Sequence, residues 1–185
     1  MLTRLLLRRV LWHAGDMTSS DPVSAPSADP AAPAADGAPL DILGPDPDIS
    51  RADAVLQGTL AERLGIRCLR LAADGGEMTM PVEGNTQPAA LLHGGATIAL
   101  AETIASMAAY VQARTVHGAG AQAVGTSVSA THHRSGRRGL VTAHCSALHL
   151  GRQVASYLVE VRDEDERLLS TVQVSTMLLA PRPAS

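Results

Sequence analysis

Aromatic side chains are nearly absent from this chain of 185 residues: they make up 2%, with one Trp, two Tyr and no Phe. Lysine is missing as well, so all 15 basic residues are arginine, and the formal net charge is −3. A nucleic-acid surface needs aromatic rings for base stacking and a basic track for the phosphates, and this composition supplies neither. We therefore expect no nucleic-acid partner and a core of aliphatic side chains.

Cysteine is scarce too, and its placement excludes two classes of protein. Cys68 and Cys145 lie far apart without a CxxC spacing, which rules out a disulfide scaffold and a cysteine-rich zinc site and fits a reducing compartment. We expect a cytoplasmic protein with neither a metal nor another cofactor. The histidines do not indicate a metal site either. Four of them match no common zinc spacing, and neighbouring side chains on a strand face opposite sides of the sheet: His132, His133, His144 and His149.

A disordered tail is expected ahead of one folded domain. Seven of the eleven prolines lie within residues 22–47, and this stretch is rich in Ala, Ser and Asp without a basic residue. Such a composition cannot bury a core. The chain is therefore divided into a tail over residues 1–48, a folded domain over 49–181 and a short C-terminal tail over 182–185.

No segment is expected to cross a membrane. The most apolar stretch, residues 91–111, is long enough to span a bilayer, but it is rich in Gly and Ala and carries polar side chains. The N-terminus resembles a targeting segment, yet two arginines interrupt its apolar run and no small-residue cleavage site follows cleanly. We expect Met17 to be the true start and the sixteen residues before it to be an extension.

The domain predicts one buried helix and an antiparallel sheet. A short helix is expected over residues 53–64, and a turn at Asp74-Gly75-Gly76 predicts a hairpin. From Gly94 to about Gln112 the chain is Ala-rich and nearly apolar all round, which predicts a long buried helix. We expect an α+β domain in which an antiparallel meander of about five to six strands wraps this central helix. The hairpin strands cover residues 66–72 and 77–82, and the later strands cover 123–133, 139–150, 153–162 and 168–179.

Glu102 is chemically unusual, because it lies in the middle of this apolar helix with no basic residue three or four positions away. A buried unpaired carboxylate is costly, so such a group is neutral, paired or functional. The functional interpretation is a general base or nucleophile, with the Ser106 hydroxyl one turn later on the same face. The structural alternative is a carboxylate at a solvated edge or a subunit boundary.

The start of the same helix, His93-Gly94-Gly95, offers free amides at the positive end of the helix dipole. An amide there can hold a developing oxyanion, and glycine lets a ligand approach closely. Eight residues separate Gly94 from Glu102, or about 12 Å along a helix, too far for both to act on one carbonyl. A common site therefore requires two chains whose helices lie antiparallel across a twofold axis.

The segment over residues 87–106, QPAALLHGGATIALAETIAS, resembles the signature of the hot-dog-fold acyl-CoA thioesterases. The most similar branch is the PaaI-like group, which includes the Arthrobacter-type 4-hydroxybenzoyl-CoA and the 1,4-dihydroxy-2-naphthoyl-CoA thioesterases. The resemblance implies a hot-dog fold, hydrolysis of acyl-CoA thioesters of aromatic or related acids, and a homodimer or homotetramer with sites at the dimer interface. It runs from about Leu56 to Leu179 and includes further blocks at residues 124–125, 132–135, 148–152 and 175–179.

The resemblance also implies roles for individual residues. Glu102 matches the catalytic carboxylate, Gly94 the amide that polarises the thioester carbonyl, and Ser106 the helper hydroxyl. Gln87 and His93 match the polar pair near the carbonyl and the attacking water. The expected coenzyme A contacts are Gly125, His132, Arg134, Ser135, His149, Gly151 and Arg152.

Two features depart from the family pattern: the linker after the helix is longer, and His133 replaces a usually apolar residue. A non-catalytic module that binds acyl-CoA remains the alternative function. The intact set of Glu102, Gly94 and Gln87 favours the enzyme, because a binding module has no need of the carboxylate. A hot-dog dehydratase would place a His and an Asp at other positions.

Overall fold

The computed structural model of the protein describes residues 43–181. The expectations for residues 1–42 and 182–185, including the choice between Met1 and Met17 as the start, lie outside this range. Leu43 belongs to the expected tail, yet its side chain is fully buried in the hydrophobic core. The folded core therefore includes Leu43, which lies before the expected start of the domain at residue 49.

Two short helices begin the domain: α2 (Ile49–Leu56) and α3 (Leu60–Arg63). The single helix expected over residues 53–64 is therefore wrong. Gly58 has φ of 73°, a left-handed conformation that ends α2, and Thr59 then caps α3 by accepting a hydrogen bond from the Ala61 amide. The Thr59 hydroxyl also donates to the carbonyl of Leu56, which ties the two helices together.

Six strands form one antiparallel sheet in the order β1-β2-β4-β5-β6-β3. The predicted hairpin and the four later strands are confirmed to within a few residues. The expected meander is wrong, because β3 does not pair with β4 but lies beyond β6 at the far edge. The bounds are β1 (Arg67–Ala72), β2 (Gly75–Pro81), β3 (Gln122–His132), β4 (Leu140–Leu150), β5 (Val154–Asp163) and β6 (Leu168–Leu179).

The link between β3 and β4 explains this order. After β3, the amides of His133 and Arg134 both donate to the Leu169 carbonyl on β6. The chain then passes the start of the long helix, where the Gly136 carbonyl accepts a hydrogen bond from the Leu92 amide. It enters β4 on the other side of β5 and β6, so β3 keeps one free edge.

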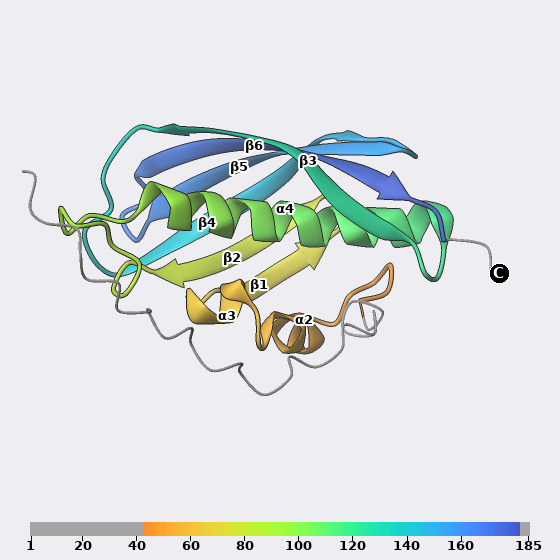
Figure 1. Ribbon diagram of the computed structural model, residues 1–185, viewed down its shortest axis with the longest axis horizontal. Helices are drawn as coiled ribbons and strands as arrows, with labels where there is room; N and C mark the ends of the chain where they lie inside the picture. The colour runs from red at the N-terminus through yellow and green to blue at the C-terminus, as the bar shows by residue number, and fades with distance from the viewer. Residues whose placement is uncertain (1–42, 182–185) are drawn as a thin grey trace, which may run out of the picture. The chain divides into compact units, whose positions relative to one another are not determined.

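The central helix α4 (Gly94–His117) lies along the inner face of the sheet (Figure 1). It continues to His117 instead of ending near Gln112, and Gly118 in a positive-φ conformation ends it. Its many alanines let the strands approach closely. By length and composition α4 could cross a membrane, but most of that stretch is buried, so it is the core helix of the domain.

The edge strand β3 has an unusual surface, because none of its residues is buried. Val124 and Val128 are 48% and 40% exposed, and the strand carries no charged residue and no proline. A long, uncharged edge strand with free backbone groups is a template for pairing with another strand. Figure 1 shows β3 crossing α4 at this open edge.

Candidate active site

Glu102 projects from the middle of α4 and is exposed in the single chain, which agrees with the alternative of a carboxylate at a solvated edge or a subunit boundary. The sheet wraps the other faces of α4, and the face of Glu102 opens onto a groove of about 670 Å³. We call this cavity the α4 groove. Ser106 lines it too, as its position one turn after Glu102 predicts. The α4 groove lies between the α2–α3 segment, α4 and the start of β3, and its apolar lining includes Val55, Leu56, Leu60, Met107, Tyr110 and Ala123.

Gly125 lies against Glu102 in the same chain. A Cβ atom built on Gly125 would stand 3.2 Å from Oε1 of Glu102. Gly125 was expected among the contacts to coenzyme A, but the structure places it beside the candidate catalytic carboxylate. The packing of β3 over α4 causes this proximity, which depends on residues far apart in the sequence.

The start of α4 has a defined cap. His93 is the N-cap residue, and its Nδ1 accepts a hydrogen bond of 2.8 Å from the Gly95 amide. Because Nδ1 is an acceptor, the neutral imidazole carries its proton on Nε2. Among the residues that the structure describes, no group hydrogen-bonds the amide of Gly94, so this N–H is available to a ligand. The His93 ring lies in a separate depression beside Leu64 and Asn85.

A second cavity, of about 290 Å³, lies at the start of α4, and we call it the helix-start pocket. His132 points into it, with Nδ1 2.8 Å from the hydroxyl of Ser170, a buried residue of β6. Sequence reasoning missed Ser170, since an isolated serine in a strand carries no signal of its role. The helix-start pocket brings five of the predicted site residues together: Gln87, Gly94, His132, Arg134 and Ser135.

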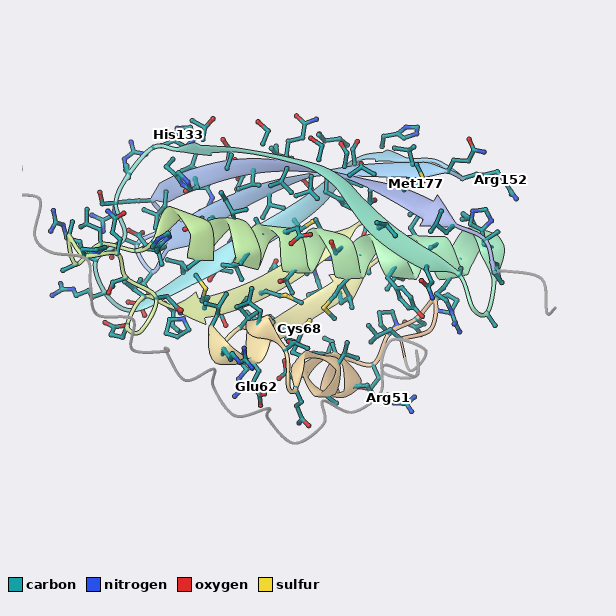
Figure 2. The ribbon with its side chains drawn as sticks, viewed as in Figure 1. Arg51, Glu62, Cys68, His133, Arg152 and Met177 are labelled. Carbon is teal, nitrogen blue, oxygen red and sulfur yellow. The ribbon has the colours of Figure 1, made fainter. Side chains whose placement is uncertain are left out.

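The remaining predicted contacts lie at the opposite end of α4. Gln112 donates to the Gly151 carbonyl at 3.2 Å, and a ring nitrogen of His117 lies 2.6 Å from the Arg152 carbonyl. His149 lies with these residues. A helix of 24 residues spans about 36 Å, so one chain does not bring this group to the helix-start pocket. Figure 2 shows Arg152 and His133, which follows His132, at opposite ends of the sheet.

Other reactive groups of the folded part have structural surroundings. Burial raises the pKa of Cys68 to about 11 and that of Cys145 to about 12, so both thiols are protonated at neutral pH and are poor nucleophiles. His144 lies 3.6 Å from Glu77 across the outer face of the sheet. Within residues 43–181, no three His, Cys, Asp or Glu side chains are grouped so that they could hold a metal ion.

Known proteins with the same pattern are thioesterases. The thioesterase superfamily model matches residues 90–170 of this chain. The proofreading thioesterase EntH of Cronobacter turicensis is 46% identical over 128 residues, which cover 69% of this chain and 90% of that protein.

Solved structures of thioesterases are also similar to this chain. A thioesterase of Pseudomonas aeruginosa superposes with a TM-score of 0.67 and 31% identity, covering 72% of this chain and 95% of that one. A thioesterase of Haemophilus influenzae gives 0.65 and 29%, covering 72% and 91%. The PaaI protein of Escherichia coli, 22% identical with a TM-score of 0.62 over 70% of this chain and 91% of that one, shares the fold.

Proposed function

This chain belongs to the thioesterase superfamily and has its hot-dog fold, and on that premise we propose that it hydrolyses acyl-CoA thioesters to the free acid and coenzyme A. The family makes this chain a thioester hydrolase and not a non-catalytic module that binds acyl-CoA.

The reaction needs a hydrogen-bond donor that holds the oxygen of the thioester carbonyl. It also needs a nucleophile that attacks the carbonyl carbon, or a base that activates water to do so. The free Gly94 amide at the start of α4 binds the carbonyl oxygen and stabilises the oxyanion that forms on it. As a general base, Glu102 removes a proton from the attacking water, which Ser106 orients, and passes that proton to the sulfur as the C–S bond breaks, so that coenzyme A leaves as its thiol. As a nucleophile, Glu102 attacks the carbonyl carbon itself and expels coenzyme A as its thiolate, and water then hydrolyses the acyl–Glu102 anhydride to the free acid. Gln87, which lines the helix-start pocket with Gly94, orients the carbonyl.

The observation that carries this proposal is the separation of Gly94 from Glu102. They lie eight residues apart on one straight helix and line two different cavities. A single chain therefore holds two half-sites, and a complete site combines Gly94 of one subunit with Glu102 of its partner. The free edge of β3 supplies the surface on which the two chains pair.

Contacts within one chain predict the register of this pairing. Gly94 adjoins His132, and Glu102 adjoins Gly125. When Gly94 meets the partner's Glu102, His132 of one β3 lies near Gly125 of the other, so the two strands run antiparallel. Since a twofold axis through the sheet keeps each side chain on its own face, one residue must lie opposite its own copy. The midpoint between positions 132 and 125 makes this residue Val128 or Ser129.

Disulfide cross-linking tests the register. Val128→Cys and Ser129→Cys are oxidised separately, and one of them is expected to give a covalent dimer, because a disulfide needs Cα atoms within about 7 Å. The two natural cysteines are buried and do not compete. Thr131→Cys on the same strand is the matched control, since it lies well away from its own copy. Cross-linking of Thr131→Cys alone would place the axis elsewhere and refute the shared site.

We propose an aromatic or related acyl group, which the α4 groove accepts beside Glu102. Its lining is largely apolar, with Met107 and the aromatic ring of Tyr110 on α4 and Val55 on α2. The resemblance to the PaaI-like branch supports the same choice. A hydrolysis panel of aryl, phenylacetyl and straight-chain CoA esters, followed with a thiol-detecting dye, is expected to give the highest kcat/KM with an aryl ester. Equal rates across the panel would argue against it.

Two further parts of the proposal concern the cellular compartment and the oligomeric state. The free thiols of Cys68 and Cys145 fit the reducing cytoplasm, where we place the protein. Beyond the dimer, pairing of two dimers into a homotetramer is the assembly that the family resemblance supports. Mass measurement of the native protein in solution distinguishes the dimer from the tetramer.

A further inference from the structure

Gly125, which has no side chain, lies beside the carboxylate of Glu102. An ideal Cβ at position 125 would stand 3.2 Å from Oε1 of Glu102, which is closer than an unstrained carbon–oxygen contact. Gly125 has no positive φ, so its backbone alone would accept any L-residue. A side chain at position 125 would therefore compete with the carboxylate for the same space.

The strand is also irregular at this point. Gly125 lies opposite Thr176 and Ser127 lies opposite Ser175, so Thr126 is an extra residue that forms a β-bulge. The Thr126 hydroxyl donates to the Ser175 carbonyl at 3.0 Å. Thr176, behind Gly125, is fully buried and donates to the Ala155 carbonyl. The backbone of β3 beside the carboxylate is therefore held by β6 on its paired side.

No charge fixes the orientation of Glu102. Within the described part of the chain, no arginine or histidine forms an ion pair with it. Its carboxylate is exposed on the α4 groove and lies beside β3 at the position that lacks a side chain. A side chain at position 125 would thus restrict where the carboxylate can lie.

We propose that Gly125 is a positioning residue: together with the bulge at Thr126, it forms the seat that holds the Glu102 carboxylate toward the thioester carbonyl. The inference rests on the proposed catalytic role of Glu102. The expected contact of Gly125 with coenzyme A is a separate prediction, which the KM of the same variants tests. A methyl group at position 125 displaces the carboxylate by a few tenths of an ångström, and a larger side chain displaces it further.

A graded series of variants tests the seat. Gly125→Ala is expected to lower kcat about tenfold and Gly125→Val about a hundredfold, because small displacements of a reacting group are costly, while KM changes by less than about twofold. Ser146→Ala and Ser146→Val are the matched controls. Ser146 is exposed on β4, pairs with Leu158 and lines neither the α4 groove nor the helix-start pocket, so neither control is expected to change kcat. Thermal midpoints and native masses show that each variant folds and assembles.

Rescue by a shorter acid separates positioning from a general structural effect. Glu102→Asp alone lowers kcat, but its shorter side chain leaves room for the methyl group that Gly125→Ala introduces. The double variant Gly125→Ala/Glu102→Asp is therefore expected to retain at least about threefold more activity than the product of the two single losses. Losses that simply multiply would overturn the inference.

The outcomes also distinguish this inference from the proposed function. An increase in KM without loss of kcat in Gly125→Ala would make Gly125 a substrate contact and refute the seat. If Glu102→Gln is inactive while the Gly125 variants behave like the Ser146 controls, only the seat is refuted. If Glu102→Gln keeps normal turnover, the proposed function itself fails.

Discussion

The imidazole of His132 lies directly against Gly94: a Cβ atom built on Gly94 would stand 2.8 Å from its Nε2. The ring is held there by the contact between its Nδ1 and the Ser170 hydroxyl. A side chain at position 94 therefore requires this ring to move, and Gly94 and His132 line the same helix-start pocket. Variants at position 94 can be interpreted only when this ring is treated together with them.

Glu102→Gln is expected to lower kcat by at least about a hundredfold, since an amide cannot accept the proton or attack the carbonyl. The thermal midpoint is expected to stay unchanged or to rise, because no ion pair within residues 43–181 is lost. Steady-state kinetics and thermal melting measure the two effects. Glu166→Gln, in the exposed turn before β6, is the control and should alter neither. Normal turnover in a folded Glu102→Gln protein would contradict the catalytic role.

Arg134→Ala and Arg152→Ala are each expected to raise KM about tenfold and leave kcat unchanged, because contacts to the phosphates of coenzyme A are equally present in the ground and transition states. Both side chains are exposed, and the Arg134 guanidinium donates one hydrogen bond, to the Leu168 carbonyl. Arg67→Ala on the exposed part of β1 is the control. A collapse of kcat at constant KM would show that these residues do not anchor the nucleotide.

The sequence predicts the elements of this fold better than their order. Alternation of apolar and polar residues, together with turn residues, locates the strands, and a long Ala-rich run locates α4. The place of β3 beyond β6 is not visible in any local pattern, since the link at residues 133–139 is as short as one that joins paired strands. Similarly, the break at Gly58 depends on a single glycine inside a segment that otherwise favours a helix.

The candidate site shows the same division. Glu102 could be selected from the sequence, because a carboxylate in an apolar helix is chemically unusual. Its exposure could not be predicted, because an apolar pattern all round α4 does not reveal which face the sheet leaves open. The proximity of Gly125 to Glu102, and of Ser170 to His132, depends on contacts between distant segments.

Two truncations test where the folded part begins. Removal of residues 1–42 is expected to leave the thermal midpoint unchanged. Removal of residues 1–48 also removes the fully buried Leu43, and loss of a buried leucine costs about 2–5 kcal/mol of unfolding free energy. Leu43→Ala in the full chain is expected to reproduce the difference. Denaturant unfolding measures all three, and equal stability of the two truncated proteins would contradict the core role of Leu43.

The two buried cysteines predict a loss of stability at alkaline pH. Their pKa values, about 11 for Cys68 and about 12 for Cys145, lie above the ordinary thiol value of 9.0, chiefly because burial disfavours the thiolate. The unfolded chain therefore loses these protons first as the pH rises, so the contribution to stability is complete below pH 9 and declines above it, up to about pH 11 for Cys68 and about pH 12 for Cys145. Thermal midpoints measured across this range should fall less steeply in Cys145→Ala. An identical slope would exclude the thiol as the cause.

Mixed dimers test whether each site is shared between subunits. Gly94→Pro removes the amide, but its ring would collide with His132, so it is made together with His132→Ala, and His132→Ala alone serves as reference. Both changes fall in the helix-start pocket of the same chain, whereas Glu102→Gln falls in the α4 groove. Each homodimer then carries a lesion in both of its sites and is expected to be inactive.

In a mixed dimer of these two chains, one shared site carries both lesions and the other carries neither. Random pairing makes half of the dimers mixed with one intact site each, so denaturing and refolding the two proteins together is expected to restore up to about a quarter of the wild-type activity. Mass spectrometry confirms the mixed species, and each protein refolded alone is the control. Mixed dimers that form but stay inactive would mean that each site is built within one chain, although Gly94 and Glu102 lie about 12 Å apart along the same helix.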